Sequence, residues 1–178
     1  IDIDPDIEGQ TSYITVVESL ATRLTLEVAL PGMYVFPVEM ADGNIYTAVS
    51  APGSGLFEFG KPAVPLFGEW ILTPNGAEAE LLEVSPGAPV IFPDMELPPV
   101  QPPLPDDYVG PLPPPFAKDE EIYGTDAECP VIFAGLEPTQ IMRGQECSII
   151  WLYPYQHNPV RRTLAVYPDL SVTVQFHG

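Results

Sequence analysis

The sequence predicts an all-β fold, namely a single jelly-roll-like β-sandwich or barrel that carries one long proline-rich excursion. Two observations carry this prediction. Short runs of β-branched and aromatic residues recur along the 178-residue chain, and turn residues separate them. The stretch from Pro93 to Phe116 is dominated by proline, which has no backbone N–H to donate and is excluded from helix interiors and central strands.

The chain begins with an acidic segment, residues 1–10, in which acidic residues alternate from Asp2 to Glu8. The calcium-binding loop of an EF-hand needs Gly at its sixth position and Glu at its twelfth. Counted from Asp2, those places hold Ile7 and Tyr13, so the motif is absent. We expect a solvated acidic N-terminal arm.

The clearest strand of the first half is residues 22–29 (TRLTLEVA), where apolar and polar residues alternate as in a half-buried antiparallel strand. Pro37 makes the run 33–40 an edge or bulged strand. Residues 42–44 (DGN) predict a hairpin turn. The strands expected before the prolines are 12–18, 22–29, 33–40, 45–50, 69–73, 79–84 and 89–92.

After the prolines, residues 117–123 (AKDEEIY) predict a helix of one or two turns. Further strands are expected at 130–134, 147–153, 162–167 and 170–176. A segment of about 50 residues rarely forms a core of its own, so these strands should pair with strands of the first half. Residues 1–178 are then one domain, and 93–128 is a loop that leaves and rejoins it.

The charge of the chain excludes several kinds of partner. It has 25 acidic and 6 basic residues and a net charge of −19. Nucleic acid and anionic lipid are bound through Lys and Arg, so we expect neither as a partner. No apolar run approaches the ~20 residues of a membrane-spanning helix, so direct membrane insertion is not expected. Such a surface fits a protein of strong brine or an acidic extracellular protein in ordinary salt.

No catalytic, cofactor or metal site can be assembled from the sequence. Cys129 and Cys147, with His157 and His177, do not have the spacing of zinc ligands, and no positioned base accompanies either cysteine. We therefore expect no enzymatic activity, no cofactor and no metal. The two cysteines are a candidate disulfide, but as antiparallel neighbours their strands would place the sulfurs at opposite ends. Buried free thiols are the alternative.

Two segments carry candidate subunit contacts. The excursion presents Leu104, Tyr108 and Phe116 among its prolines, and loops of this length without regular structure are usually functional or disordered. It can pack on its own sheet or on a neighbouring subunit. The basic doublet Arg161-Arg162 can pair with the acidic surface of the chain or with a neighbouring subunit.

Taken together, the acidic all-β chain with strands on both sides of one long excursion resembles the smaller major capsid protein of haloarchaeal internal-membrane icosahedral viruses. This resemblance rests on architecture and composition and not on a motif. It implies an upright single jelly-roll barrel in a virion. Such a subunit assembles with copies of itself and with other capsid proteins, through arms such as Asp2–Glu8 and the proline stretch.

Two other functions remain open beside a capsid subunit. One is a decoration or cement protein on a virus shell. The other is a secreted β-sandwich module that binds carbohydrate or calcium, because the aromatic residues of the second half are of the kind that form binding surfaces. They are Trp151, Tyr153, Tyr155 and Tyr167.

Overall fold

The computed structural model describes residues 14–30, 32–52, 54–55, 58–110 and 114–178. The acidic arm predicted at 1–10 lies outside these residues. The elements, in chain order, are β1 (Ile14–Leu20), β2 (Arg23–Ala29), β3 (Tyr34–Glu39), β4 (Ile45–Ser50), β5 (Phe67–Leu72), β6 (Glu78–Pro86), β7 (Val90–Phe92), α1 (Glu120–Gly124), β8 (Ala134–Leu136), β9 (Gln140–Met142), β10 (Gln145–Leu152), β11 (Tyr155–Asn158), β12 (Thr163–Val166) and β13 (Asp169–His177).

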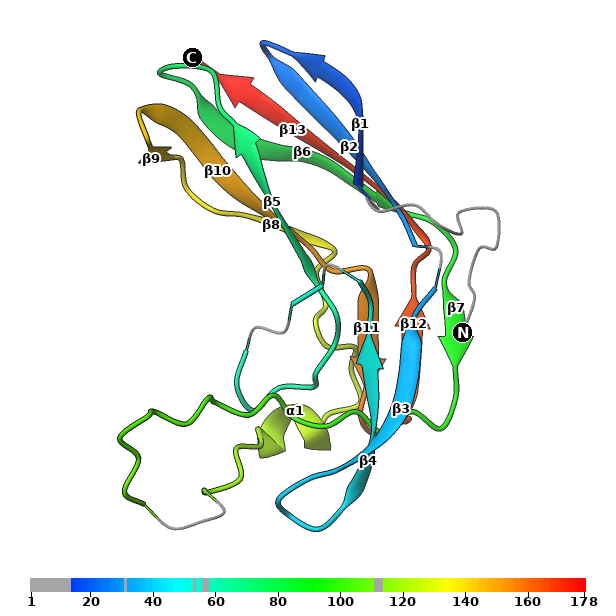
Figure 1. Ribbon diagram of the computed structural model, residues 1–178. Coiled ribbons are helices and arrows are strands. Elements are labelled where there is room, and N and C mark those ends of the chain that lie inside the picture. The colour runs from blue at the N-terminus through cyan, green and yellow to red at the C-terminus, as the bar shows by residue number, and fades with distance from the viewer. Residues whose placement is uncertain (1–13, 31, 53, 56–57, 111–113) are drawn as a thin grey trace.

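Two antiparallel sheets form the upper half of the molecule in Figure 1. One has the strand order β1-β2-β13-β6 and the other the order β5-β10-β8, with β9 also paired to β10. Every second residue of β13, from Leu170 to Phe176, is at most 7% exposed, and the residues between them are half-exposed. This alternation shows that one face of the sheet packs against the core and the other is partly exposed to solvent. The prediction of an all-β, sandwich-like fold is confirmed.

The lower half of Figure 1 holds a three-stranded sheet, in the order β11-β12-β7, and the hairpin β3-β4. The predicted turn at 42–44 is confirmed, with Gly43 at φ 79° and a hydrogen bond of 3.0 Å from Met40 N to Asn44 O. Among the described strands, β3 with Pro37 pairs only with β4, as expected for an edge strand.

One hydrophobic cluster runs through both halves. Its fully buried members include Leu97, Ile150, Tyr155, Leu164 and Val172, which come from the proline stretch and four different strands. The strands after the prolines pair with strands before them, as predicted: β10 with β5, β12 with β7, and β13 with both β2 and β6.

Three local predictions are wrong. Strands β9 and β11 were not expected, and β11 lacks an apolar pattern although all four of its residues are buried. The strand expected at 130–134 contributes only Ala134 to β8, because Pro130, Val131 and Ile132 line a pocket instead and Val131 is 72% exposed. The helix begins later than expected, since Asp119 caps it by accepting from Glu121 N and Ile122 N at 3.1 Å each.

The candidate disulfide between Cys129 and Cys147 is not formed, and both thiols are free. Different parts of the fold hold them. Cys147 lies in β10, 1% exposed, opposite Leu72 of β5. Cys129 lies beside β11, where its backbone exchanges two hydrogen bonds with His157, of 2.8 and 2.9 Å. The buried-thiol alternative therefore describes Cys147, and Cys129 is half-buried at a pocket.

Candidate functional site

The proline-rich excursion leaves the body of the protein from a firmly held base. Met95 and Leu97 are buried at 6% and 0% exposure. Beyond them the chain runs antiparallel to residues 60–63. Backbone hydrogen bonds of 2.8 Å join Ala63 N to Pro98 O, Val100 N to Lys61 O and Gly60 N to Val100 O. The prolines can take part because this edge needs only their carbonyl oxygens.

The returning end of the excursion is tied to the outgoing end by the side chain of Gln101. Its Nε2 donates to Ala117 O at 2.7 Å and to Pro99 O at 3.0 Å, and its Oε1 accepts from Ala117 N at 2.9 Å. Phe116, the residue directly before Ala117, packs against Tyr46 with the two ring centroids 6.5 Å apart. Burial and a hydrogen bond to Asp42 raise the pKa of Tyr46 to about 12, so it stays neutral.

Between these ties, the excursion projects from the lower left of Figure 1. Tyr108 N donates to Pro105 O at 3.1 Å and closes a turn over the acidic pair Asp106-Asp107. The ring of Tyr108 lies so close to Gly110 that a Cβ there would overlap it. Leu104 is 46% exposed and Val109 is 98% exposed. The described part of the loop is thus stiffened by proline and turned tightly, and it presents apolar side chains to solvent.

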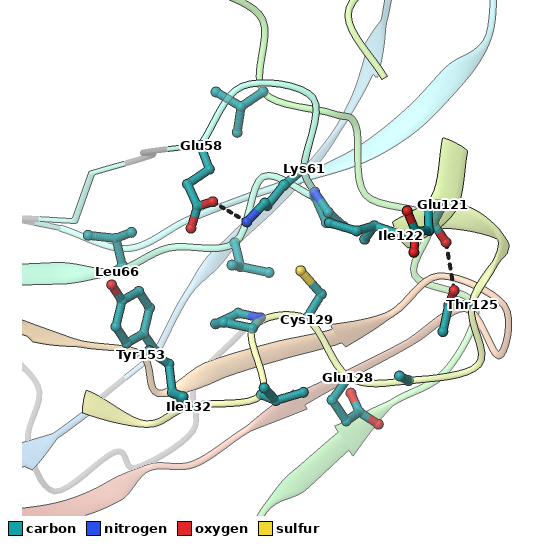
Figure 2. Close-up of a pocket in the computed structure, with 16 residues that line it drawn as sticks. Glu58, Lys61, Leu66, Glu121, Ile122, Thr125, Glu128, Cys129, Ile132 and Tyr153 are labelled. Carbon is teal, nitrogen blue, oxygen red and sulfur yellow. Dashed lines mark hydrogen bonds and ion pairs between the residues drawn. The ribbon is translucent and has the colours of Figure 1, made fainter. Parts of the chain in front are cut away.

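A pocket of about 470 Å³ lies at the base of the excursion, under α1. Figure 2 shows Cys129 and Tyr153 facing into it, with Lys61 and Glu58 forming an ion pair at its rim. Its walls are otherwise mainly apolar, from Pro62, Val64, Leu66, Val100, Ile122, Ala127, Pro130, Val131 and Ile132. Glu121, Thr125 and Glu128 complete the lining, so the arrangement can hold an apolar group beside the Lys61–Glu58 pair and two further carboxyl groups.

The titratable groups of this pocket are not arranged for catalysis. Burial raises the pKa of the Cys129 thiol, so the thiol stays protonated and is a poor nucleophile. His157, which lies outside the lining, is fully buried; burial lowers its pKa to about 4, and its Nε2 is hydrogen-bonded to Met95 O at 2.9 Å. Burial raises the pKa of Glu128. In the part of the chain that the structure describes, no cluster of His, Cys, Asp and Glu could hold a metal ion.

The residues predicted as contacts fall into two groups. Leu104, Tyr108 and Phe116 all belong to the excursion. Arg161 and Arg162 lie in the turn between β11 and β12, where each forms an ion pair within the chain. Arg161 Nε lies 2.7 Å from Asp126 Oδ1, and Arg162 Nη2 lies 3.4 Å from Glu96 Oε2. That these five residues contact a partner stays a prediction.

Sequence reasoning missed the residues that hold the excursion in place. Gln101 is the only hydrogen-bonding side chain between Pro98 and Pro105, and that isolation is the one signal that could have indicated its role. Tyr123 OH donates to Leu97 O at 2.9 Å and ties α1 to the buried start of the stretch. Nothing in the sequence around Tyr123 indicates this long-range contact.

Among the described helices, none is long and apolar enough to cross a membrane.

The chain resembles peptidase pro-domains in sequence and in fold. The sequence model of the family Propeptide_C25 matches residues 2–178. A structure described as the complex of Porphyromonas gingivalis RgpB pro- and mature domains superposes with a TM-score of 0.78 at 16% identity, covering 95% of this chain and 87% of that chain. A structure on the zymogenic latency of gingipain K from Porphyromonas gingivalis superposes with a TM-score of 0.80 at 22% identity, covering 100% and 97%. No curated protein sequence matches the chain.

These matches overturn the capsid interpretation. The family and both solved structures concern peptidase pro-domains, so the resemblance to a haloarchaeal capsid protein is wrong. The virion localisation and the predicted assembly with copies of itself and other capsid proteins are wrong with it, as are the cement-protein and binding-module alternatives. Acidic charge and all-β patterning are shared by many unrelated proteins. Net charge in particular reports on solubility and association and not on fold. The prediction that the chain is not itself an enzyme is confirmed, since the family is a propeptide.

Proposed function

The chain belongs to the Propeptide_C25 family, and from that membership we propose that it is the inhibitory pro-domain of a C25 peptidase of the gingipain type. It binds the peptidase domain of its own precursor and keeps that domain latent until it is removed. The observation that carries the proposal is the family match over residues 2–178. The solved pro- and mature-domain complex of the related RgpB supports a direct contact between the two parts. The precursor is secreted or displayed on a bacterial cell surface.

The excursion is the part of the fold best suited to make this contact. Binding costs the entropy of ordering a loop, and a loop that is already ordered avoids most of that cost. Its prolines, the Gln101 tie and the turn at Tyr108 restrict the described part before any partner arrives. Leu104 and Val109 are exposed there at 46% and 98% and gain burial only in a complex.

The pocket at the base supports the same assignment. It opens beside Val100, in the outgoing part of the excursion, and is large enough for an apolar side chain of a partner. Its rim ion pair, Lys61 with Glu58, is half-exposed and contributes little to stability by itself. We propose that the peptidase domain contacts both the excursion and this pocket, which share Val100.

The test compares the precursor, which contains both parts, with the peptidase domain alone. Hydrolysis of a fluorogenic peptide should be low for the precursor and should rise when the chain is cleaved away. A precursor carrying Leu104→Asp should lose part of its latency, because a carboxylate replaces an apolar contact. The matched control is Leu82→Asp, which alters an exposed leucine of β6 at 54% exposure. Equal activity of the precursor and the free peptidase domain would overturn the proposal.

A further inference from the structure

The two upper sheets differ in the chemistry of their outer faces. Residues that pair directly across two strands project from the same face, so the register of β13 with β2 and β6 identifies the outer face of the first sheet. The outward positions of β13 from Ser171 to Gln175 and their direct partners are all polar: Arg23, Thr25, Glu27, Glu80, Glu83, Ser85, Ser171, Thr173 and Gln175. This is the usual composition of an antiparallel sheet face in contact with water.

The outer face of the second sheet, β5-β10-β8, is apolar instead. Ile71 of β5 is 5% exposed and faces the core, so Trp70 and Leu72 on either side of it face outward. Trp70 is paired with Ile149 of β10 and Leu72 with Cys147, which places these four side chains on one face. Trp70 is 49% exposed and Leu72 is 69% exposed. Large apolar side chains that adjoin one another on a surface mark an interaction site.

Trp151 continues this face across the sheet. It is paired with Gly68 of β5 on one side and with Gly135 of β8 on the other. A Cβ at Gly68 would overlap the Trp151 ring, so the ring lies over β5, on the same face as Trp70. Its Nε1 donates to Glu137 Oε1 at 3.1 Å, which holds the ring in this position. Both tryptophans of the chain therefore lie on this one face.

The face is continuous with the pocket at the base of the excursion. Tyr153 follows Trp151 by two residues, and a Cβ at Gly135 would lie 3.8 Å from the Tyr153 ring and 4.0 Å from the Trp151 Cβ. The two side chains are therefore neighbours on the same side of β8. Tyr153 also lines the pocket, into which it points in Figure 2. A partner seated on the pocket therefore meets this face next, above the excursion in Figure 1.

One positive charge at the end of this sheet is not compensated by an ion pair in the described part of the chain. The other five of the six basic residues form ion pairs, namely Arg23, Lys61, Lys118, Arg161 and Arg162. Arg143 lies at the tip of the β9-β10 hairpin, with φ 52°, and Gly144 follows it with φ 80°. In a chain with a net charge of −19, such an arginine is available to a carboxylate of a partner.

These features favour a different polypeptide over a second copy of the chain as the partner. Two copies would each carry a net charge of −19 and repel each other. The peptidase domain is instead the partner that we propose for the adjoining pocket, and it belongs to the same precursor. Trp, Tyr and Arg are the residues most enriched among those that carry the binding energy of protein interfaces.

We propose that the outer face of the sheet β5-β10-β8, from Tyr153 through Trp151 and Trp70 to Leu72, binds an apolar surface of the peptidase domain, and that a carboxylate of that domain pairs with Arg143. This inference rests on the proposed function. It adds a docking surface on the body of the sandwich to the contacts made by the excursion and the pocket.

The test measures binding of the chain to the separately purified peptidase domain by calorimetry. Trp70→Ala removes the exposed ring and Leu72→Asp places a charge on the face, so each should raise Kd at least tenfold. Arg143→Asn, which keeps a residue tolerated at positive φ, should raise Kd several-fold and reduce its salt dependence. The matched control is Leu82→Asp, at an exposed leucine of the other sheet, and its Kd should stay within twofold. Thermal unfolding followed by circular dichroism verifies that each variant is folded.

Fluorine NMR of the chain labelled with 5-fluorotryptophan supplies the second readout. The chain has two tryptophans, so it gives two signals, and Trp70→Phe assigns them. Unlabelled peptidase domain should shift the Trp70 signal and reduce its solvent isotope shift, because the ring loses contact with water.

A Kd within twofold of the wild type for both Trp70→Ala and Leu72→Asp, or an unshifted Trp70 signal in the complex, overturns this inference while the proposed function stands. An unchanged Kd for Arg143→Asn overturns the ion pair. Failure of the unaltered chain to bind the peptidase domain overturns the inference and the proposed function together. Variants of this face that alter self-association of the chain and leave peptidase binding intact would assign the face to a second copy instead.

Discussion

Replacing Gln101 with alanine removes the side chain that ties the two ends of the excursion together. Gln101 makes three hydrogen bonds, at 2.7 Å to Ala117 O, 2.9 Å from Ala117 N and 3.0 Å to Pro99 O. A hydrogen bond within a protein contributes about 0.5–1.5 kcal/mol net, and these groups are only partly buried, so we expect a loss of about 2 kcal/mol in the free energy of unfolding. The assay is urea denaturation followed by circular dichroism.

The same variant should also loosen the excursion specifically. Amide exchange at Ala117 should accelerate, and affinity for the peptidase domain should fall because the loop must then be ordered on binding. Gln101→Glu keeps the acceptor for Ala117 N but loses the donor to Ala117 O, so it should lose part of the stability. Gln145→Ala, at an exposed glutamine of β10, is the control. A loss below about 0.5 kcal/mol for Gln101→Ala, or one equal to that of the control, would refute the reasoning.

Two further predictions concern the body of the fold. His157 has a pKa of about 4 in the folded protein, below its ordinary value of 6.5, so its neutral form stabilises the fold fully above pH 6.5. That contribution should disappear as the pH falls from 6.5 to 4, so the free energy of unfolding should decrease by about 3 kcal/mol. The difference in unfolding free energy between the wild type and His157→Gln should show this pH dependence. A difference that does not change with pH would contradict the prediction. Gly68→Ala should destabilise by about 1–3 kcal/mol and shift tryptophan fluorescence, because the new Cβ would overlap the Trp151 ring of the neighbouring strand. Gly124→Ala, where a Cβ meets no atom within 4 Å, should be nearly neutral in thermal unfolding, and equal effects of the two changes would refute the packing argument.

The all-β character could be predicted because the local signals agree with the global fold. Alternation at 22–29, the turn at 42–44 and the pattern at 170–176 each correspond to an observed strand or hairpin. The pairing across the proline stretch followed from size alone, since the residues after it are too few to form a separate core. The strand β11 could not be predicted in this way. Its buried Gln156, His157 and Asn158 carry no apolar signal, and only tertiary contacts place them inside.

The functional surfaces depend on long-range contacts that composition does not reveal. The excursion was identified from its prolines, but its shape depends on Gln101 reaching Ala117 and on Tyr123 reaching Leu97. The family could not be read from acidic charge and strand spacing, because both properties occur in many folds.

The measurement that tests the central claim most directly is a titration of the free peptidase domain with the purified chain. Activity against a fluorogenic peptide is followed as the chain is added at a peptidase concentration well above Kd. An inhibitory pro-domain should reduce activity linearly to near zero, with an endpoint at one chain per peptidase. Activity that is unchanged at a large excess of folded chain would contradict the account.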